Sequence, residues 1–201
     1  MLRATDYDLN RSRLETFFGR SATIPQLDLP RREHSTQREE NGGVRTTVAG
    51  LQTFGPGPTE FRPACSIQAA SNRGKRLHFE HFVHAESLRG PVSNQIHAKI
   101  PFVAQFVQLR PKIRSHVGTD TQYDLDLVDD AVVNAVVHRA YAISGAKIQL
   151  VVFADLLELY SPGDLPSAFT FECMPFRTPT RNQQLASCLP RTSLHRFITN
   201  A

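Results

Sequence analysis

The stretch from Tyr123 to Pro166 limits the possible fold more strongly than any other part of this 201-residue chain. It begins with an apolar run, 125–138, in which an acid and an amide recur at helical spacing. A polar corner and a second apolar run, 147–160, follow, and the second run has the length of a pair of strands. The turn Ser161–Pro166 ends the stretch. We therefore expect a helix, a hairpin centred on Ala154–Asp155, and a tight turn, in this order.

Asp130 and Asn134 stand four residues apart within the expected helix 124–138. Four residues make about one helical turn, so both side chains leave the same face. An acid and an amide among valines imply a compensating interaction, because burying an unpaired polar group costs free energy. That interaction is either with a bound ligand or, in a polar cluster, with hydrogen-bonding groups of the backbone.

His138 lies two turns beyond Asp130 and borders the same helical face. His138 and the following Arg139 could contact a phosphate group. They could instead place positive charge at the C-terminus of the helix, where the helix dipole favours it. Of these two interpretations we favour the helix cap for both residues.

These residues resemble the C-terminal GHKL-like module (gyrase, histidine kinase and MutL type) of RecG-related regulators, in which an AlbA-type Schlafen domain comes first. The pattern of that module is an acid and an asparagine on a helix, then H-R-x-Y, a strand hairpin and S-P-G-x-L-P. The matching residues are Asp130, Asn134, His138 to Tyr141, and Ser161 to Pro166. Weaker similarity, including Arg181-Asn182, extends the resemblance over roughly residues 40 to 190.

The resemblance implies that Asn134 binds a Mg²⁺ ion bridging the phosphates of ATP, and that Asp130 is the catalytic acid that positions the attacking water. Mg²⁺ prefers hard oxygen ligands and keeps several waters, so one amide oxygen with phosphate oxygens is sufficient. A carboxylate suits the task of polarising water near a γ-phosphate. The other cofactor-binding residues that the resemblance implies are His138, Arg139, Ser161 and Gly163.

Three departures from the superfamily pattern predict a truncated or degenerate ATP-binding domain with weak or absent ATPase activity. The acid is Asp130, one methylene shorter than the usual glutamate. Ser161 stands where the superfamily has the aspartate that reads the adenine amino group, and serine lacks the carboxylate. The second glycine-rich box, which closes over the phosphates, has no counterpart before Ala201.

Composition places the chain among ordinary globular proteins, with 40% hydrophobic and 21% charged residues. We expect a cytoplasmic protein with no membrane partner, because no secretory signal and no run long enough to cross a bilayer occur. The three cysteines, Cys65, Cys173 and Cys188, have no disulfide or zinc spacing. The net charge of +4 permits contact with polyanions, but no basic block is dense enough to predict a patch.

The predicted organisation is an N-terminal helix and polar linker, 1–40, followed by a GHKL-like ATP-binding region, 41–201, that is incomplete at its C-terminus. The linker prediction rests on 31–41, which is charged and lacks periodicity. The predicted fold class is α/β, a two-layer sandwich whose mixed, mostly antiparallel sheet is covered on one face by helices 91–109 and 124–138.

The hairpin before the first of these helices should pair a strand at 64–70 with one at 77–84. The second strand would carry His78, His81 and His84, whose spacing alternates faces and does not predict a metal site.

The sequence therefore predicts an ATP-binding domain of a RecG-related, DNA-associated transcriptional regulator. DNA contact would be indirect, through an upstream domain missing from this chain. The candidate ligands are ATP and Mg²⁺, and a homo-oligomer is the candidate assembly. The alternative is a non-catalytic protein-interaction or dimerisation module that binds no nucleotide.

Overall fold

The computed structural model describes residues 36–38, 44–76, 78–106, 109–110, 120–121, 125–164 and 180–189. The helix expected near the N-terminus lies outside the described residues. The elements, in chain order, are β1 (Thr36–Arg38), β2 (Val44–Thr46), α3 (Val48–Phe54), α4 (Pro58–Phe61), the 3₁₀ turn η2 (Pro63–Cys65), β3 (Ile67–Asn72), the 3₁₀ turn η3 (Phe79–His81), β4 (Phe82–Leu88), α5 (Val92–Phe106), β5 (Leu109–Arg110), β6 (Asp120–Thr121), α6 (Leu125–His138), β7 (Ile148–Val152), β8 (Leu157–Tyr160) and α7 (Gln183–Ser187).

A four-stranded sheet of order β4-β3-β7-β8 forms the centre of the fold. Strand β3 runs parallel to β7, with Ile67 opposite Ile148, and both outer pairs are antiparallel. The sheet is thus mixed and mostly antiparallel, which confirms the predicted fold class. The parallel pair at the centre is possible because α5 and α6 provide the long crossover that parallel strands require.

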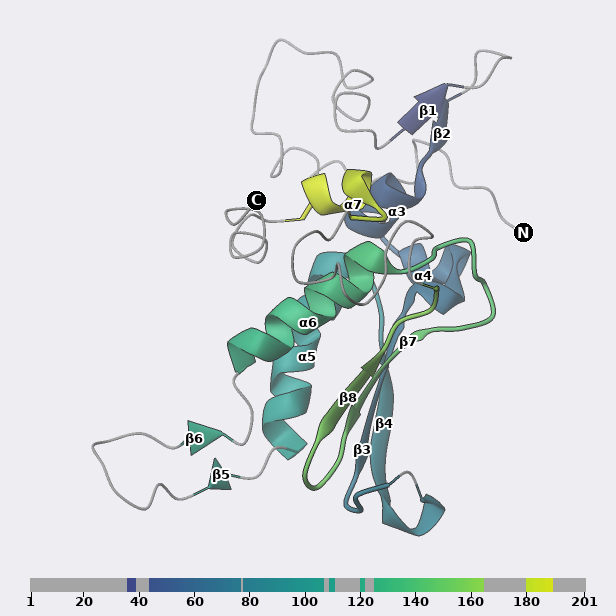
Figure 1. Cartoon of the computed structure of the whole chain (residues 1–201). Coiled ribbons are helices and arrows are strands. Elements are labelled where there is room, and N and C mark those ends of the chain that lie inside the picture. Colours follow the sequence, from purple (N-terminus) through teal and green to yellow (C-terminus); the bar gives the residue numbers. More distant parts are fainter. Residues whose placement is uncertain are drawn as a thin grey trace.

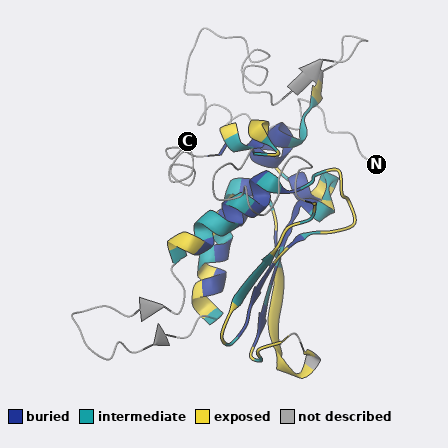
Figure 2. Cartoon of the chain, in the orientation of Figure 1, coloured by how far each residue is buried: buried dark blue, intermediate teal, exposed yellow. Residues whose placement is uncertain are grey.

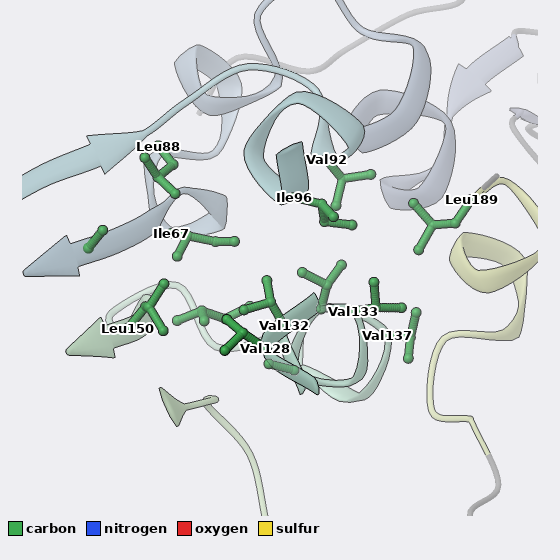
Figure 3. Close-up of a cluster of buried hydrophobic side chains, with 14 of the residues drawn as sticks. Ile67, Leu88, Val92, Ile96, Val128, Val132, Val133, Val137, Leu150 and Leu189 are labelled. Carbon is green, nitrogen blue, oxygen red and sulfur yellow. The ribbon is translucent and has the colours of Figure 1, made fainter. Parts of the chain in front are cut away.

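Helices α5 and α6 lie together on one face of this sheet, so the fold has two layers (Figure 1). The strands supply the alternating apolar side chains of that face, and α6 supplies a stripe of valines that pack against them. Burying one valine side chain contributes roughly 1.5 to 3 kcal/mol, so this stripe is a main source of stability. Figure 3 shows the resulting core, in which the labelled residues are Ile67, Leu88, Val92, Ile96, Val128, Val132, Val133, Val137, Leu150 and Leu189.

The central helix begins at Leu125 and ends at His138, in agreement with the expected 124–138. The preceding helix, α5, is shorter than the expected 91–109, and Pro101 lies within it at an exposed position. The β7–β8 hairpin turns around Ala154 and Asp155 as predicted.

One sequence prediction was wrong in detail. The partner of β3 begins at Phe82 rather than at 77, because the side chain of Asn72 holds the preceding residues in a loop. Residues 36–38, within the expected polar linker, form β1 and pair with β2. The pairing spans the expected boundary at residue 40, because the backbone groups of a charged segment can still complete a two-stranded ladder.

Candidate functional site

The C-terminal end of α6 is held by three side chains from outside the helix. The last four carbonyls of a helix have no partner within it. The Ser161 hydroxyl donates to the Ala135 carbonyl at 2.8 Å, and the Tyr141 hydroxyl donates to the Val136 carbonyl at 3.2 Å. Burial raises the pKa of Tyr141 well above its usual value, so this hydroxyl remains a donor.

Asn182 provides the third cap. Its side-chain amide donates to the carbonyls of Val137 and Arg139, both at 2.8 Å, and its backbone N–H donates to Val137 at 3.1 Å. The S-P-G turn joins the same corner, because the Ala140 N–H donates to the Pro162 carbonyl at 2.8 Å. The motifs singled out in the sequence therefore converge on one helix end.

Arg139 lies in the interior, with 1% of its surface exposed. Its guanidinium donates to the carbonyls of Ala64, Ile143 and Ala146 at 3.2, 3.0 and 2.7 Å, and it lies 4.9 Å from the centre of the Tyr141 ring. These carbonyls belong to loops and not to the last turn of α6. Arg139 therefore joins the loop after α6 to the segment before β3, and no exposed face remains for contact with a ligand.

Asp130, Asn134 and His138 form a stripe along α6, at intervals of four residues. All three are partly exposed, whereas the valines between them are buried. Among the described residues, the side chain of Asn134 has no hydrogen-bond partner. The stripe is therefore accessible to a ligand, and the Ser161 turn adjoins it through the carbonyl next to Asn134.

Gly163 and Arg181 lie at the His138 end of this stripe. Gly163 has a φ of +127°, and a Cβ placed on it would lie 2.8 Å from the Cβ of Ala140 and 3.2 Å from Nη1 of Arg181. A side chain at position 163 would therefore collide with its neighbours. Glycine lets the turn pass close to both the helix end and the guanidinium.

Arg181 also places a positive charge near His138. Burial and, after it, the Arg181 guanidinium lower the pKa of His138 below its usual value. A second nitrogen of Arg181 donates to the carbonyl of Asp164 and so holds the guanidinium beside the turn. This arginine was not among the predicted site residues, although the Arg181-Asn182 echo in the sequence was a signal for it.

A buried ion pair lies behind the acidic end of the stripe. Nζ of Lys99 on α5 lies 2.5 Å from Oδ1 of Asp129, and Asp130 adds to the negative charge that Lys99 experiences. Asp129 thus points toward α5, while Asp130 belongs to the accessible stripe. The two neighbouring acids therefore have different surroundings, since Asp129 is paired with Lys99 and Asp130 lies in line with Asn134 and His138.

Residues 145–199 match the family model described as "Putative ATP-dependent DNA helicase recG C-terminal". This segment, which contains the β7–β8 hairpin, the S-P-G turn and Arg181-Asn182, is therefore similar to a RecG-related, HATPase-like C-terminal region. The predicted resemblance is confirmed for this part of the chain. The match covers less than half of the chain and begins after α6, so it does not include Asp130, Asn134 or His138.

The fold is similar to the crystal structure of the DIP2311 protein from Corynebacterium diphtheriae, with a TM-score of 0.67 and 17% sequence identity. The similarity covers 96% of this chain and 38% of that protein, so this chain spans well under half of the length of the protein it resembles. No curated protein matches the chain.

The described residues lack two further features. They contain no group of three or more His, Cys, Asp or Glu side chains arranged to hold a metal ion. None of the helices in this part of the chain is long and apolar enough to cross a membrane.

Proposed function

We propose that the stripe Asp130-Asn134-His138 binds the triphosphate of ATP together with Mg²⁺, and that the chain is a degenerate ATP-binding domain. The observation that carries this proposal is the position of the stripe: its His138 end lies beside the S-P-G turn and Arg181, and these two belong to the segment that matches the RecG-related family. An acid, an amide, an imidazole and an arginine along one accessible line suit a phosphate chain with a bound metal.

Each residue has a distinct role in this proposal. The amide oxygen of Asn134 is a ligand for Mg²⁺, and phosphate oxygens and waters complete the coordination. His138 and Arg181 contact phosphate oxygens, and Gly163 lets the backbone approach them. Asp130 lies where a carboxylate could hold a water molecule near the terminal phosphate.

Weak affinity and little or no turnover are part of the proposal. The Ser161 hydroxyl donates to the Ala135 carbonyl, so it offers the adenine amino group only an acceptor in place of a carboxylate. An adenine amino group that is poorly hydrogen-bonded loses on the order of 1 to 3 kcal/mol of binding free energy. This loss lowers the affinity roughly tenfold to a hundredfold. We place this domain in a cytoplasmic, RecG-related transcriptional regulator that contacts DNA through another domain and assembles as a homo-oligomer.

Calorimetric titration with a non-hydrolysable ATP analogue tests the proposal. The wild type should bind weakly, EDTA should remove the binding, and Asn134→Ala should abolish it, because a neutral amide cannot offset the triphosphate charge without the metal. Asn94→Ala is the matched control, since Asn94 is an exposed asparagine on a different helix, α5. Binding that survives both EDTA and Asn134→Ala contradicts the assignment of the site.

A second candidate function is an interaction or dimerisation module that binds no nucleotide. It is favoured by the structural use of Arg139 and Ser161, both of which pair with carbonyls of the fold. If the calorimetric titration showed no heat of binding at millimolar nucleotide, the result would support this second function over the first.

A further inference from the structure

The tip of the β3–β4 hairpin carries the densest group of exposed cations in the described part of the chain. Arg73, Lys75 and Arg76 follow β3 directly, and all three are exposed. His78 and His81 follow on the same tip and are also exposed. These five residues lie within positions 73–81, where apolar and acidic residues interrupt them, and the sequence analysis predicted no basic patch there.

The backbone of this tip is fixed by hydrogen bonds. Asn72, which is buried, accepts from the Gly74 N–H at 2.8 Å and donates to the His78 carbonyl at 3.0 Å. The Arg73 N–H donates to the His81 carbonyl at 2.8 Å, and the Ala154 N–H of the neighbouring hairpin donates to the Gly74 carbonyl at 3.2 Å. The cations therefore stand on an ordered frame, which lowers the entropy lost when they bind a partner.

The positive charge of the tip is largely available. Lys75 lies 3.2 Å from Asp155, but both side chains are well exposed, and such a pair is weak in water. Neither Arg73 nor Arg76 pairs with a carboxylate among the described residues. Glu80 is the other acid on the tip, and it lies 3.9 Å from His78.

Exposed planar side chains accompany these cations. The rings of His78 and His81 lie 5.7 Å apart, and Phe82 at the start of β4 is 52% exposed. Exposed rings beside arginine side chains are common on surfaces that contact nucleic acids. Figure 2 shows that β4, which follows the tip, is exposed along most of its length.

The tip lies at the opposite end of the sheet from the nucleotide stripe's C-terminal corner (Figure 1). The strand pairing supports this arrangement. Ile67 pairs with both Leu88 and Ile148 at the end of the strands that lies away from the tip. The tip can therefore contact a partner without covering Gly163 or Arg181.

We propose that the β3–β4 tip binds the phosphate backbone of duplex DNA. Arginine and lysine side chains at the tip of one hairpin suit this partner, since phosphates carry the negative charge of the duplex and most protein contacts to DNA are made to them. The contact is made to phosphates and is therefore independent of base sequence.

Fluorescence anisotropy with a short labelled duplex, over a range of salt concentrations, tests the proposal with the whole chain. Binding should weaken as salt rises, with a log–log slope of about 2 to 3 in magnitude for two to three phosphate contacts. The double variant Arg73→Gln/Arg76→Gln should reduce the slope by about 2 and lower the affinity at least tenfold at low salt.

The matched control is Arg89→Gln/Lys147→Gln, which removes the same charge next to Leu88 and Ile148, at the other end of the sheet. It should keep most of the affinity, and Asn134→Ala should leave DNA binding unchanged, which separates this proposal from the nucleotide site. Circular dichroism checks that each variant is folded. Equal losses in the two double variants, no binding at low salt, or a clear preference for single strands over the duplex would each overturn the assignment.

Discussion

Lys99 and Asp129 join α5 to α6 through an ion pair, with Nζ of the lysine 2.5 Å from Oδ1 of the aspartate. The lysine side chain is fully buried, whereas the aspartate side chain is 22% exposed. Nζ also donates to the Ile96 carbonyl at 2.7 Å. The pair fixes α6 against α5 immediately beside Asp130, and its two members differ in their access to water.

This difference predicts unequal costs for the two single substitutions. Asp129→Ala leaves an uncompensated buried ammonium and should lower the free energy of unfolding by about 3 to 5 kcal/mol. Lys99→Met should cost much less, because water can reach the remaining carboxylate. Chemical denaturation at neutral pH measures both values, and equal costs would contradict the buried position of Lys99.

The same pair predicts a dependence on alkaline pH. Burial lowers the pKa of Lys99, and the hydrogen bond that Lys99 donates to Asp129 offsets part of this effect. In the unfolded chain the pKa of lysine is about 10.4. Between the lowered pKa and this value the unfolded chain binds more protons, so the free energy of unfolding rises with pH there. Asp129→Ala lowers the pKa of Lys99 further, so in this variant the rise should begin at a lower pH, which denaturation at several pH values would show.

The fold was largely predictable because its helices and strands have strong local patterns. The valine stripe of α6 and the apolar run before Tyr160 have lengths and periods that admit one interpretation each. The start of β4 was not predictable, because it depends on the side chain of Asn72 bonding to a loop backbone. Short-range periodicity carries no information about such a bond.

The candidate site was predictable only in part. The spacing of Asp130 and Asn134 indicated a common face, and the structure places both on the accessible side of α6. Sequence could not show that Arg139 lies inside the protein, because an arginine at a helix end is usually solvated. It also could not show that Arg181, far along the chain, lies beside His138, since this proximity arises from the packing of α7 near the end of α6.

Gly163→Ala should destabilise the protein by about 1 to 3 kcal/mol, because the backbone there has a φ of +127° that L side chains rarely adopt. The new methyl group would also lie 2.8 Å from the Cβ of Ala140. Gly145→Ala is the control, since a Cβ at that position meets no atom within 4 Å. Thermal unfolding of the two variants provides the comparison, and a Gly163→Ala variant as stable as Gly145→Ala would show that the turn is not constrained.

Arg181→Gln should raise the pKa of His138. Burial is the larger cause of the lowered pKa and remains in the variant, so the pKa should move toward about 6.5 without reaching it. Since the unfolded chain binds more protons below that value, the wild type loses stability as pH falls through this window, and the variant should lose less. NMR titration of the imidazole measures the pKa, with Arg89→Gln as the control. An unchanged pKa would remove Arg181 from the candidate site.

The caps at the end of α6 predict an order of stability among three variants. Asn182→Ala removes both side-chain hydrogen bonds to the carbonyls of Val137 and Arg139 and should cost about 1 to 3 kcal/mol. Asn182→Asp should cost more, because a carboxylate cannot donate and its charge is unfavourable at a helix C-terminus. Ser161→Ala should cost least, since the side chain is exposed and water can replace its hydroxyl at the Ala135 carbonyl.

Urea denaturation of the three variants, with Asn94→Ala as the matched control on α5, measures this order of stability. If Asn182→Asp proved as stable as the wild type, the amide of Asn182 would not be a cap, and the corner formed by the S-P-G turn and Arg181 would need another support.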